Sequence, residues 1–359
     1  MNQAKVSIVM PIFNASEYLH QSLGELVKQT LNDIEIICVN DGSTDNSLDI
    51  IQQYAYHDPR IKIIDKKNSG YGNTMNIGIS IAQGDYIGIL EPDDFPELNM
   101  YESLYQQASL YDADVVKSNY FEYSQKQNSN MFCEVLSGQP YNQVINAWEN
   151  EWLPFLRPCI WSAIYKRTLI QNSNILFNET PGASYQDTAF AFKVWVCAKK
   201  VVFIKDAYLH YRIDNDNSSV KSSGKVFSIC DEFQAIQAFL NQNRDYKNHY
   251  SKILQVLKLD SYNWNLQRIA PEFKDMFKDQ MALDFIKADY DKVLDRTYFD
   301  DDRWNLLQSL MNEYKNKNFY IEDLKKEILD LRNSHSYRIG HVLMILPGKL
   351  KRILHNRKR

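Results

Sequence analysis

The sequence predicts an α/β protein: a Rossmann-like, mixed but mainly parallel sheet flanked by helices, followed by a C-terminal helical region. Two observations support this fold class. In the first 120 residues, apolar runs typical of buried strands alternate with segments of helical periodicity. Such an order requires crossover connections, which produce parallel strand pairing. From about residue 225 onward, the apolar spacing is helical throughout.

The individual elements follow from this alternation. Strands are predicted where apolar residues run together, at residues 5–13, 34–39, 61–65, 86–90 and 113–123. Helices are predicted where apolar residues recur every three or four positions, at residues 16–29, 45–54, 74–82 and 188–198. A short strand is expected over 201–204, and the Trp- and Pro-rich segment 124–180 has no regular pattern.

The composition excludes several classes of protein. Of the 359 residues, 44% are hydrophobic and 24% charged, which excludes a collagenous or broadly disordered chain. No apolar run is long enough for a membrane-spanning helix, and the N-terminus does not resemble a signal peptide. The five cysteines are scattered without a Cys-x-x-Cys pair, which argues against a disulfide framework or a zinc site and favours a reducing cytoplasm.

Polar residues gather in the loops that follow the predicted strands. Because ligands of parallel α/β sheets bind at the carboxyl ends of the strands, these loops are the candidate site. The first loop holds Pro11, Phe13 and Asn14, and the second holds Asp41 before a glycine. The carboxylate of Asp41 is suited to accept a hydrogen bond from the imide N–H of a uracil. The alternative is an Asx-turn followed by a helix cap.

Two further loops carry glycines and carboxylates. The loop after the third strand contains Asn68 and Gly70 ahead of a helix, where backbone can approach a phosphate; the alternative is an ordinary strand-to-helix loop. The fourth strand is followed by three carboxylates in four residues, which include Glu91 and Asp93. Clustered carboxylates repel one another unless a cation neutralises them. This favours Mg²⁺ or Mn²⁺ with a diphosphate over a surface turn.

Together these loops resemble the family 2 glycosyltransferases, which have the GT-A fold. The matching segments are Pro-x-Phe-Asn near residue 11, Asn-Asp-Gly-Ser-Thr-Asp near residue 41, Asn-x-Gly near residue 68 and acid-x-Asp-Asp near residue 91. The resemblance spans about residues 4–220. It implies a nucleotide-sugar site formed by Pro11, Phe13, Asn14, Asp41, Asn68 and Gly70.

The resemblance also assigns roles to the carboxylates. Glu91 and Asp93 match the two acids of the family's DxD motif, so Glu91 is expected near the ribose and Asp93 on the metal. Glu91 replaces the usual Asp, and Met75 stands where many members have an arginine, so one charged contact with the nucleotide or phosphate is either supplied from elsewhere or absent. Further along the chain, Asp187 matches the catalytic base of the family's ED motif, with Gln186 in place of the preceding Glu.

The implied reaction is a single displacement that inverts the anomeric centre. Asp187 removes the proton of an acceptor hydroxyl, while Mn²⁺ or Mg²⁺ at Asp93 and His210 offsets the charge on a leaving UDP. Arg212 matches the last residue of the family's His-x-Arg segment and adds a donor to the phosphate oxygens. Without the resemblance, Asp187 is more typical of a helix N-cap than of a base. His210 is equally typical of a buried histidine bonded to backbone.

The expected function is a metal-dependent hexosyl- or N-acetylhexosaminyltransferase. Its donor is a UDP-sugar, and its acceptor is a glycan or lipid-linked precursor of a bacterial surface polysaccharide. Trp161 and Tyr185 are the candidates for the acceptor site, with core packing as the simpler role for a tryptophan. Two alternatives are a nucleotidyltransferase and a non-catalytic sugar-nucleotide-binding assembly protein. No nucleic-acid partner is expected.

The C-terminal part carries two further patterns. Apolar residues spaced alternately by three and four, from Leu307 to Leu331, form a heptad pattern that predicts a homo-oligomer. From Arg332 to Arg359 there are eight Lys or Arg and no acid, so the remainder of the chain carries −12 against a net charge of −4 overall. This basic tail has an apolar face and predicts peripheral attachment to the anionic inner face of the cell membrane. The alternative is a packed helix with a solvated basic end.

These patterns divide the chain into four parts. They are a GT-A catalytic domain at 1–224, a helical subdomain at 225–300, a coiled-coil-like oligomerisation helix at 301–334 and a basic amphipathic tail at 335–359.

Overall fold

The computed structural model describes residues 3–215 and 225–333. The chain divides into two compact units, Met1–Lys274 and Asp275–Arg359. The candidate site belongs to the first unit.

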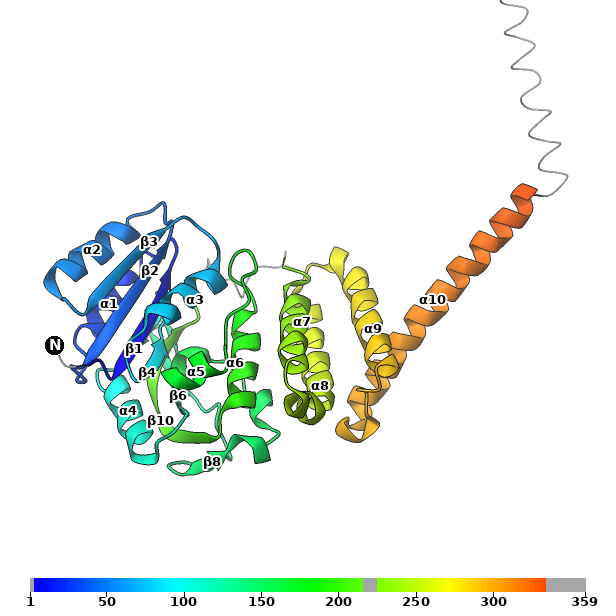
Figure 1. Cartoon of the computed structure of the whole chain (residues 1–359). Helices are drawn as coiled ribbons and strands as arrows, with labels where there is room; N and C mark the ends of the chain where they lie inside the picture. Colours follow the sequence, from blue (N-terminus) through cyan, green and yellow to red (C-terminus); the bar gives the residue numbers. More distant parts are fainter. Residues whose placement is uncertain (1–2, 216–224, 334–359) are drawn as a thin grey trace, which may run out of the picture. The chain divides into compact units, whose positions relative to one another are not determined.

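A single mixed sheet organises the first unit (Figure 1). Its strand order is β3-β2-β1-β4-β9-β6-β10-β5, with β7 paired to β6 and β8 paired to β10. The β3-β2-β1-β4 half is parallel, and β6 pairs in parallel with β10. All residues of β1 and β2 are buried, as expected for central strands covered on both faces. The strands are Val6–Ile12 (β1), Ile34–Asp41 (β2), Ile61–Lys66 (β3), Tyr86–Ile89 (β4), Phe95–Pro96 (β5), Val115–Ser124 (β6), Ser129–Cys133 (β7), Val144–Asn146 (β8), Ala163–Lys166 (β9) and Lys200–Arg212 (β10).

Helices cover both faces of this sheet. Gly78 of α3 lies against Val9 of β1, and Tyr101 of α4 lies against Gly88 of β4. Val9 pairs with Ile89, so Val9 and Gly88 point to opposite faces of the sheet. Helices α3 and α4 therefore cover opposite faces, which confirms the predicted α/β class. The helices of this unit are Leu19–Leu26 (α1), Ser47–His57 (α2), Tyr71–Ile81 (α3), Met100–Tyr111 (α4), Arg167–Asn172 (α5), Gln186–Cys197 (α6), Ser228–Asn241 (α7) and Arg244–Arg268 (α8).

The segment 124–180 contributes structure that its sequence pattern does not indicate. Strands β7, β8 and β9 lie in it, and β9 sits between β4 and β6 in the sheet. A strand of four residues is too short to show alternation. Strand β10 continues to Arg212 instead of ending at 204, because its pairing with β6 resumes after two register shifts. The 3-10 turns of the described residues are Ala147–Glu149 (η1), Leu153–Phe155 (η2), Ile160–Ser162 (η3), Pro271–Phe273 (η5) and Arg296–Tyr298 (η6).

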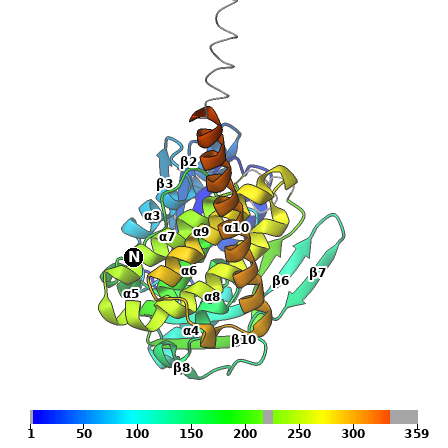
Figure 2. The ribbon, with the colours of Figure 1, turned by 90° about the vertical axis from the view of Figure 1, so that its right-hand side faces the viewer.

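The helices after residue 225 confirm the predicted helical region. Helices α7 and α8 pack on each other, and α7 packs on α6 (Figure 2). Both belong to the first unit, so the boundary between the units, at residue 274, falls inside the predicted helical subdomain 225–300. The functional division into four parts stays a prediction.

Two helices, Lys274–Tyr290 (α9) and Asp301–Asn333 (α10), account for most of the described part of the second unit. Leu307 and Leu310 of α10 are buried within the chain, and Lys317 pairs with Asp279 of α9 at 2.6 Å. The first positions of the heptad pattern are therefore already packed in a single chain, and oligomerisation stays a prediction. The basic amphipathic tail at 335–359 lies outside the described residues. Among the helices that are described, none combines the length and the apolar character needed to cross a membrane.

Candidate active site

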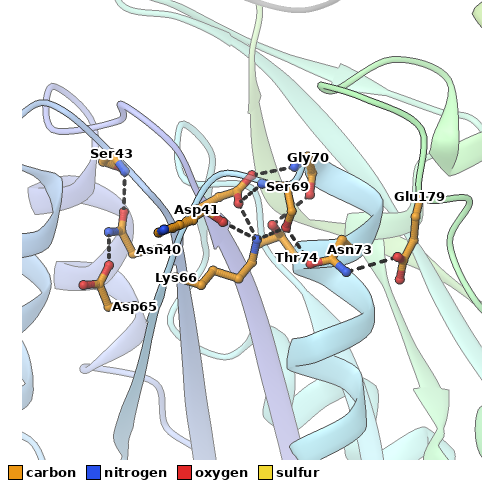
Figure 3. A network of polar contacts seen from close by, with 11 residues as sticks. Asn40, Asp41, Ser43, Asp65, Lys66, Ser69, Gly70, Asn73, Thr74 and Glu179 are labelled. Atoms are coloured by element: carbon orange, nitrogen blue, oxygen red, sulfur yellow. Dashed lines mark hydrogen bonds and ion pairs between the residues drawn. The ribbon is translucent and has the colours of Figure 1, made fainter.

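Asp41 is the centre of a polar network at the ends of β2 and β3 (Figure 3). Its carboxylate accepts hydrogen bonds from the backbone N–H groups of Ser69 (2.8 Å) and Gly70 (3.0 Å) and pairs with Lys66. Asp41 and Lys66 are neighbours because β2 and β3 place them in register. A nucleobase N–H would share carboxylate oxygens that already have three donors. The base contacts expected at Asp41 and at Asn68, an exposed residue of the same loop, stay predictions.

Asn14 joins the loops that follow β1 and β2. Its side-chain oxygen accepts a hydrogen bond from the N–H of Thr44 (2.7 Å), and its own N–H donates to Ser43 Oγ (3.0 Å). Beside it, Phe13 is 51% exposed, whereas Pro11 is buried. An exposed ring at the carboxyl end of a central strand has the surface needed to stack on a base. This geometry is compatible with the role expected for Phe13.

The glycines at the start of α3 allow the backbone of residues 178–182 to approach closely. Gly70 has a φ of +89°, a conformation that residues with side chains rarely adopt. The N–H of Tyr71 donates to the carbonyl of Gly182 (3.1 Å), and a Cβ on Gly72 would lie 2.0 Å from the carbonyl oxygen of Asn178. The start of α3 therefore packs directly on the segment that leads into α6. The phosphate contact expected at Gly70 stays a prediction.

Glu91 follows β4 and is half-buried. Its Oε1 accepts a hydrogen bond from the hydroxyl of Tyr71 at 2.6 Å. Burial raises the pKa of Glu91 to about 8; the bond from Tyr71 lowers this pKa, and the charges of Asp93 and Asp187 raise it. The predicted base Asp187 therefore lies within electrostatic reach of the predicted acidic motif, although the two are far apart in the sequence.

The next two carboxylates have different partners. Asp93 Oδ2 accepts a hydrogen bond from the side chain of Asn215 (2.8 Å), and Asp94 Oδ1 accepts one from the backbone N–H of Arg212 (2.8 Å). Asp94 is buried, and its Oδ2 has no hydrogen-bond partner among the residues that the structure describes. Burial is the main cause of a raised pKa for both carboxyl groups.

This donor set fits a divalent cation by its chemistry. Three acids in four residues have raised pKa values because burial disfavours their charged forms, and the opposing charge of Arg212 near Asp93 and Asp94 does not cancel this effect. The orphaned oxygen of Asp94 points to the same conclusion, and carboxylate oxygens are the ligands preferred by Mg²⁺ and Mn²⁺. Within residues 3–215 and 225–333, however, no three or more His, Cys, Asp or Glu side chains are already grouped as a metal site.

His210 of β10 has both ring nitrogens engaged. Nδ1 lies 2.8 Å from Asn130 Oδ1, and Nε2 lies 2.8 Å from Glu97 Oε1. The ring stacks on Phe95 and Phe121, with centroids 4.4 and 5.0 Å away. These bonds to side chains differ from the backbone bonds of the alternative interpretation. A metal ligand at His210 stays a prediction, and it would require one of these contacts to be exchanged.

Arg212 braces the acidic loop from within. Its Nε donates to the carbonyl oxygen of Asp93 (2.9 Å), and its Nη2 donates to Gln21 Oε1 (2.6 Å). The guanidinium lies 4.9 Å from the ring centroid of Tyr18 and 5.0 Å from that of Tyr123. Arg212 is 4% exposed, so it positions the loop that carries the acids. Its direct contact with phosphate stays a prediction.

Asp187 lies in the first turn of α6. Its Oδ1 accepts a hydrogen bond from the N–H of Thr188 (2.8 Å), so it has a local capping contact as well as a candidate catalytic role. Burial raises its pKa to about 6, and the bonds from Thr188 lower that pKa. A carboxylate with this pKa is mostly ionised at neutral pH and is a stronger base than an ordinary aspartate. Gln186 beside it is buried and donates to Thr180 Oγ1 (2.9 Å), which fixes the turn.

The two acceptor candidates differ in their surroundings. Trp161 is 8% exposed, stacks on Tyr211 at 4.9 Å and meets the edge of Tyr120 at 4.6 Å, as a core residue does. Tyr185 is half-buried, and its hydroxyl donates to Asn265 Oδ1 (2.6 Å). The acceptor roles of both residues stay predictions.

Sequence reasoning did not find Lys66, Tyr71 or Asn215 as parts of this site. Lys66 has a recoverable signal, because aligning the ends of two neighbouring parallel strands places it opposite Asp41. Tyr71 and Asn215 have none, since each reaches its carboxylate only through the tertiary fold.

The known proteins that this chain resembles in sequence are glycosyltransferases. Residues 7–171 match the family model for glycosyl transferase family 2. The chain is 35% identical to the glycosyltransferase GlyG of Streptococcus pneumoniae over 218 residues, which cover 58% of this chain and 70% of that protein. It is 30% identical to the uncharacterized glycosyltransferase EpsJ of Bacillus subtilis over 245 residues, which cover 66% of this chain and 70% of that protein.

Solved structures show a similar fold. The crystal structure of S. aureus TarS residues 1–349 in complex with UDP has a TM-score of 0.68 and 18% identity, covering 90% of this chain and 91% of that one. The mannosyltransferase PcManGT of Pyrobaculum calidifontis, in complex with GDP-Man and Mn²⁺, has a TM-score of 0.50 and 13% identity, covering 89% and 88%. These likenesses confirm the GT-A arrangement of the sheet and helices.

Proposed function

Because the chain belongs to glycosyltransferase family 2, we propose that it transfers a hexosyl or N-acetylhexosaminyl group from a UDP-sugar to a hydroxyl of a cell-surface glycan precursor, with inversion at the anomeric carbon. That it is a glycosyltransferase follows from its relatives; the donor, the stereochemistry and the acceptor class are our proposal. UDP is favoured as the carrier because TarS was crystallised with UDP and with UDP-GlcNAc.

One observation carries this proposal: the approach of Asp187 to the acidic motif. The charge of Asp187 contributes to the raised pKa values of both Glu91 and Tyr71. We take Asp187 as close enough to the acidic motif for it to act on an acceptor hydroxyl while the diphosphate of the donor is held at that motif. A direct displacement at the anomeric carbon requires a base and a leaving-group site near one another.

In the proposed reaction, Asp187 accepts the proton of the acceptor hydroxyl as the hydroxyl oxygen bonds to the anomeric carbon. The bond from that carbon to the diphosphate oxygen breaks, and UDP leaves with the bonding electrons. The N–H of Thr188 donates to Oδ1 of Asp187, which fixes the orientation of the carboxylate. A single displacement needs no protein nucleophile and leaves the product with inverted configuration.

Asp93 is the residue that would hold a divalent cation, with His210 as the second candidate ligand, and Glu91 would lie near the ribose. When bound, Mn²⁺ or Mg²⁺ supplies positive charge that offsets the charge on the leaving diphosphate. The structure of PcManGT with GDP-Man and Mn²⁺ supports such a requirement in this fold. Tyr71 donates to Glu91, and Asn215 donates to Asp93, so each carboxylate has one side held by the protein.

The test needs no acceptor. The full chain is incubated with UDP-glucose, UDP-galactose, UDP-GlcNAc or UDP-GalNAc and MnCl₂, and slow transfer to water is followed by proton NMR. We expect one donor to release UDP and a sugar that is first seen as the β-anomer, opposite to the α-linked donor. A sugar first seen as the α-anomer would contradict inversion, and absence of UDP release from every donor would contradict the donor class.

A further inference from the structure

Tyr185, Trp264 and Arg268 form a cluster beside the proposed base, which we call the α8 cluster. Tyr185 immediately precedes α6 and lies two positions before Asp187, while Trp264 and Arg268 lie one turn apart at the end of α8. Nη1 of Arg268 donates to the hydroxyl of Tyr185 at 2.6 Å. The guanidinium lies 4.1 Å from the ring centroid of Trp264, and the ring of Tyr185 meets that indole edge-on at 5.9 Å.

Hydrogen bonds to neighbouring residues fix the position of the cluster. The Tyr185 hydroxyl donates to Asn265 Oδ1 (2.6 Å), and the buried Asn265 side chain donates in turn to the carbonyl oxygen of Val226 (3.0 Å). Tyr185 therefore both donates and accepts, which fixes its hydroxyl and the arginine that binds it. Such a preorganised side chain loses little entropy when it binds a ligand.

Part of the cluster is exposed to solvent. Trp264 is 47% exposed, a large value for an indole that already has two side chains against it. No carboxylate of the described residues pairs with Arg268, which donates to one hydroxyl only. An indole face binds the apolar face of a sugar ring, and a guanidinium with free donors binds a carboxylate or phosphate through two parallel hydrogen bonds. The pair together is suited to a sugar that carries an anionic group.

We propose that the α8 cluster is an acceptor subsite for an anionic glycan, in which Trp264 stacks on a sugar ring and Arg268 pairs with the carboxylate or phosphate that this glycan carries. The inference rests on the proposed function, because it takes Asp187 as the base that faces the acceptor. The charges of Asp187 and Arg268 both act on Tyr185, so the base and the subsite are within electrostatic reach of one another. A neutral glycan would leave the guanidinium without a charged partner.

The experiment uses matched pairs of probes with the full chain, UDP and MnCl₂. One pair is tetragalacturonate and its neutral methyl ester; the other is phosphopentamannose and its dephosphorylated form. Binding is measured by calorimetry. We expect the charged member of at least one pair to bind about tenfold more tightly than its neutral partner. The pair that shows this preference identifies the anion as a carboxylate or a phosphate.

Variants assign the preference to the cluster. Arg268→Gln should abolish the difference between charged and neutral probes, whereas Trp264→Ala should weaken both members of the pair. Arg268→Lys should retain part of the preference, because it keeps the charge but loses the planar fork. Arg244→Gln, an exposed arginine at the other end of α8, is the matched control and should bind like the unmodified chain. Circular dichroism melts establish that each variant is folded.

Two results would overturn the subsite. One is equal binding of charged and neutral probes, or no binding of any probe, by the unmodified chain. The other is an undiminished preference in folded Arg268→Gln. UDP affinity is measured alongside: loss of UDP binding in the unmodified chain contradicts the proposed function, whereas normal UDP binding without a charge preference contradicts the α8 cluster alone.

Discussion

The hydroxyl of Tyr71 donates a 2.6 Å hydrogen bond to the carboxylate of Glu91, which ties the first residue of α3 to the loop after β4. This bond favours the ionised form of Glu91, whose pKa burial raises to about 8. The contact therefore offsets part of the rise in pKa that desolvation of the carboxylate causes. It also links the start of α3 to a loop that follows both α3 and β4 in the sequence.

Tyr71→Phe removes this donor without changing the shape of the ring. We expect the affinity for UDP with Mn²⁺ at pH 7 to fall by about tenfold. Binding draws on the ionised form of Glu91, which burial already disfavours, and this form loses a hydrogen bond of the kind that contributes about 1.5–3 kcal/mol. Titration calorimetry measures the affinity. Tyr111→Phe is the control, since its hydroxyl makes an equally short bond of 2.6 Å to the carbonyl oxygen of Asn142. Unchanged affinity in Tyr71→Phe would show that Glu91 does not act in its ionised form.

Divalent cation and UDP should stabilise the protein together. Each carboxylate of the acidic motif has a raised pKa, so a cation that neutralises them binds the folded state and raises its melting temperature. We expect UDP with MnCl₂ to raise the melting temperature by several degrees, and EDTA to cancel the shift. Asp93→Asn should lose the shift, whereas Asp49→Asn, on the exposed surface of α2, should keep it. An equal shift by UDP in EDTA would contradict a metal-dependent site.

Asp187→Asn should abolish transfer while it preserves donor binding. The change keeps the size of the side chain and its acceptor for the Thr188 N–H but removes the basic group, so transfer should fall by at least about 10²-fold. Donor hydrolysis and UDP calorimetry measure the two effects. Asp114→Asn is the control, because Asp114 binds backbone N–H groups at the amino end of β6, away from the carboxyl ends of the strands. Normal transfer by Asp187→Asn would remove the assigned base.

The same variant should be more stable than the unmodified chain at neutral pH. Because the folded-state pKa of Asp187 is raised to about 6, the folded protein binds its proton more tightly than the unfolded chain does. Stability is therefore lost as the pH rises from about 4 to 6, and an asparagine avoids this loss. Asp187→Asn should melt a few degrees higher at pH 7.5 and show little gain at pH 4.

The sequence was sufficient for the parts of the site that follow predicted strands directly. Asp41, Glu91 and Asp93 emerge at the carboxyl ends of strands whose apolar runs are unmistakable, so the edge of the sheet that they share was predictable. The resemblance to a family added Asp187, which no periodicity would have placed near Glu91. In the structure, the charge of Asp187 raises the pKa of Glu91, which is consistent with the two residues lying near one another.

Other features depend on contacts that local patterns do not encode. Strand β9 is too short for a period, yet it joins β4 to β6. The need for a glycine at position 72 has no local signal, because it comes from the carbonyl of Asn178, with which a Cβ there would collide. The phosphate contact of Arg212 stays a prediction, and the two tyrosine rings beside its guanidinium could not be predicted from the sequence. In each case the partner lies far along the chain and on an element whose position only the fold determines.

The heptad pattern of α10 leads to a prediction about assembly. Leu307 and Leu310 are buried within the chain, so truncation after Asn318 removes only the later positions of the pattern and spares this packing. We expect the full chain to form a dimer or trimer at micromolar concentration and the truncated chain to be a monomer that still binds UDP. Light scattering coupled to size exclusion measures the mass. A monomeric full chain would exclude an oligomerisation role for α10.

The basic tail leads to a prediction about location. Eight Lys or Arg and no acid, from Arg332 onward, attract an anionic bilayer with up to about 1 kcal/mol per charge near the surface. Apolar residues among them add a part that salt does not screen. We expect the full chain to float with liposomes that contain anionic lipid at low salt, and to be released at high salt because the attraction is screened. A chain that ends at Asn333 is the control and should not float.

Equal flotation of both chains would place membrane attachment elsewhere, and failure of both to float would leave the tail as an ordinary solvated segment. If the tail holds the enzyme at the bilayer, its removal should reduce transfer to lipid-linked acceptors more than transfer to short soluble sugars, because only the former share the surface with the bound enzyme.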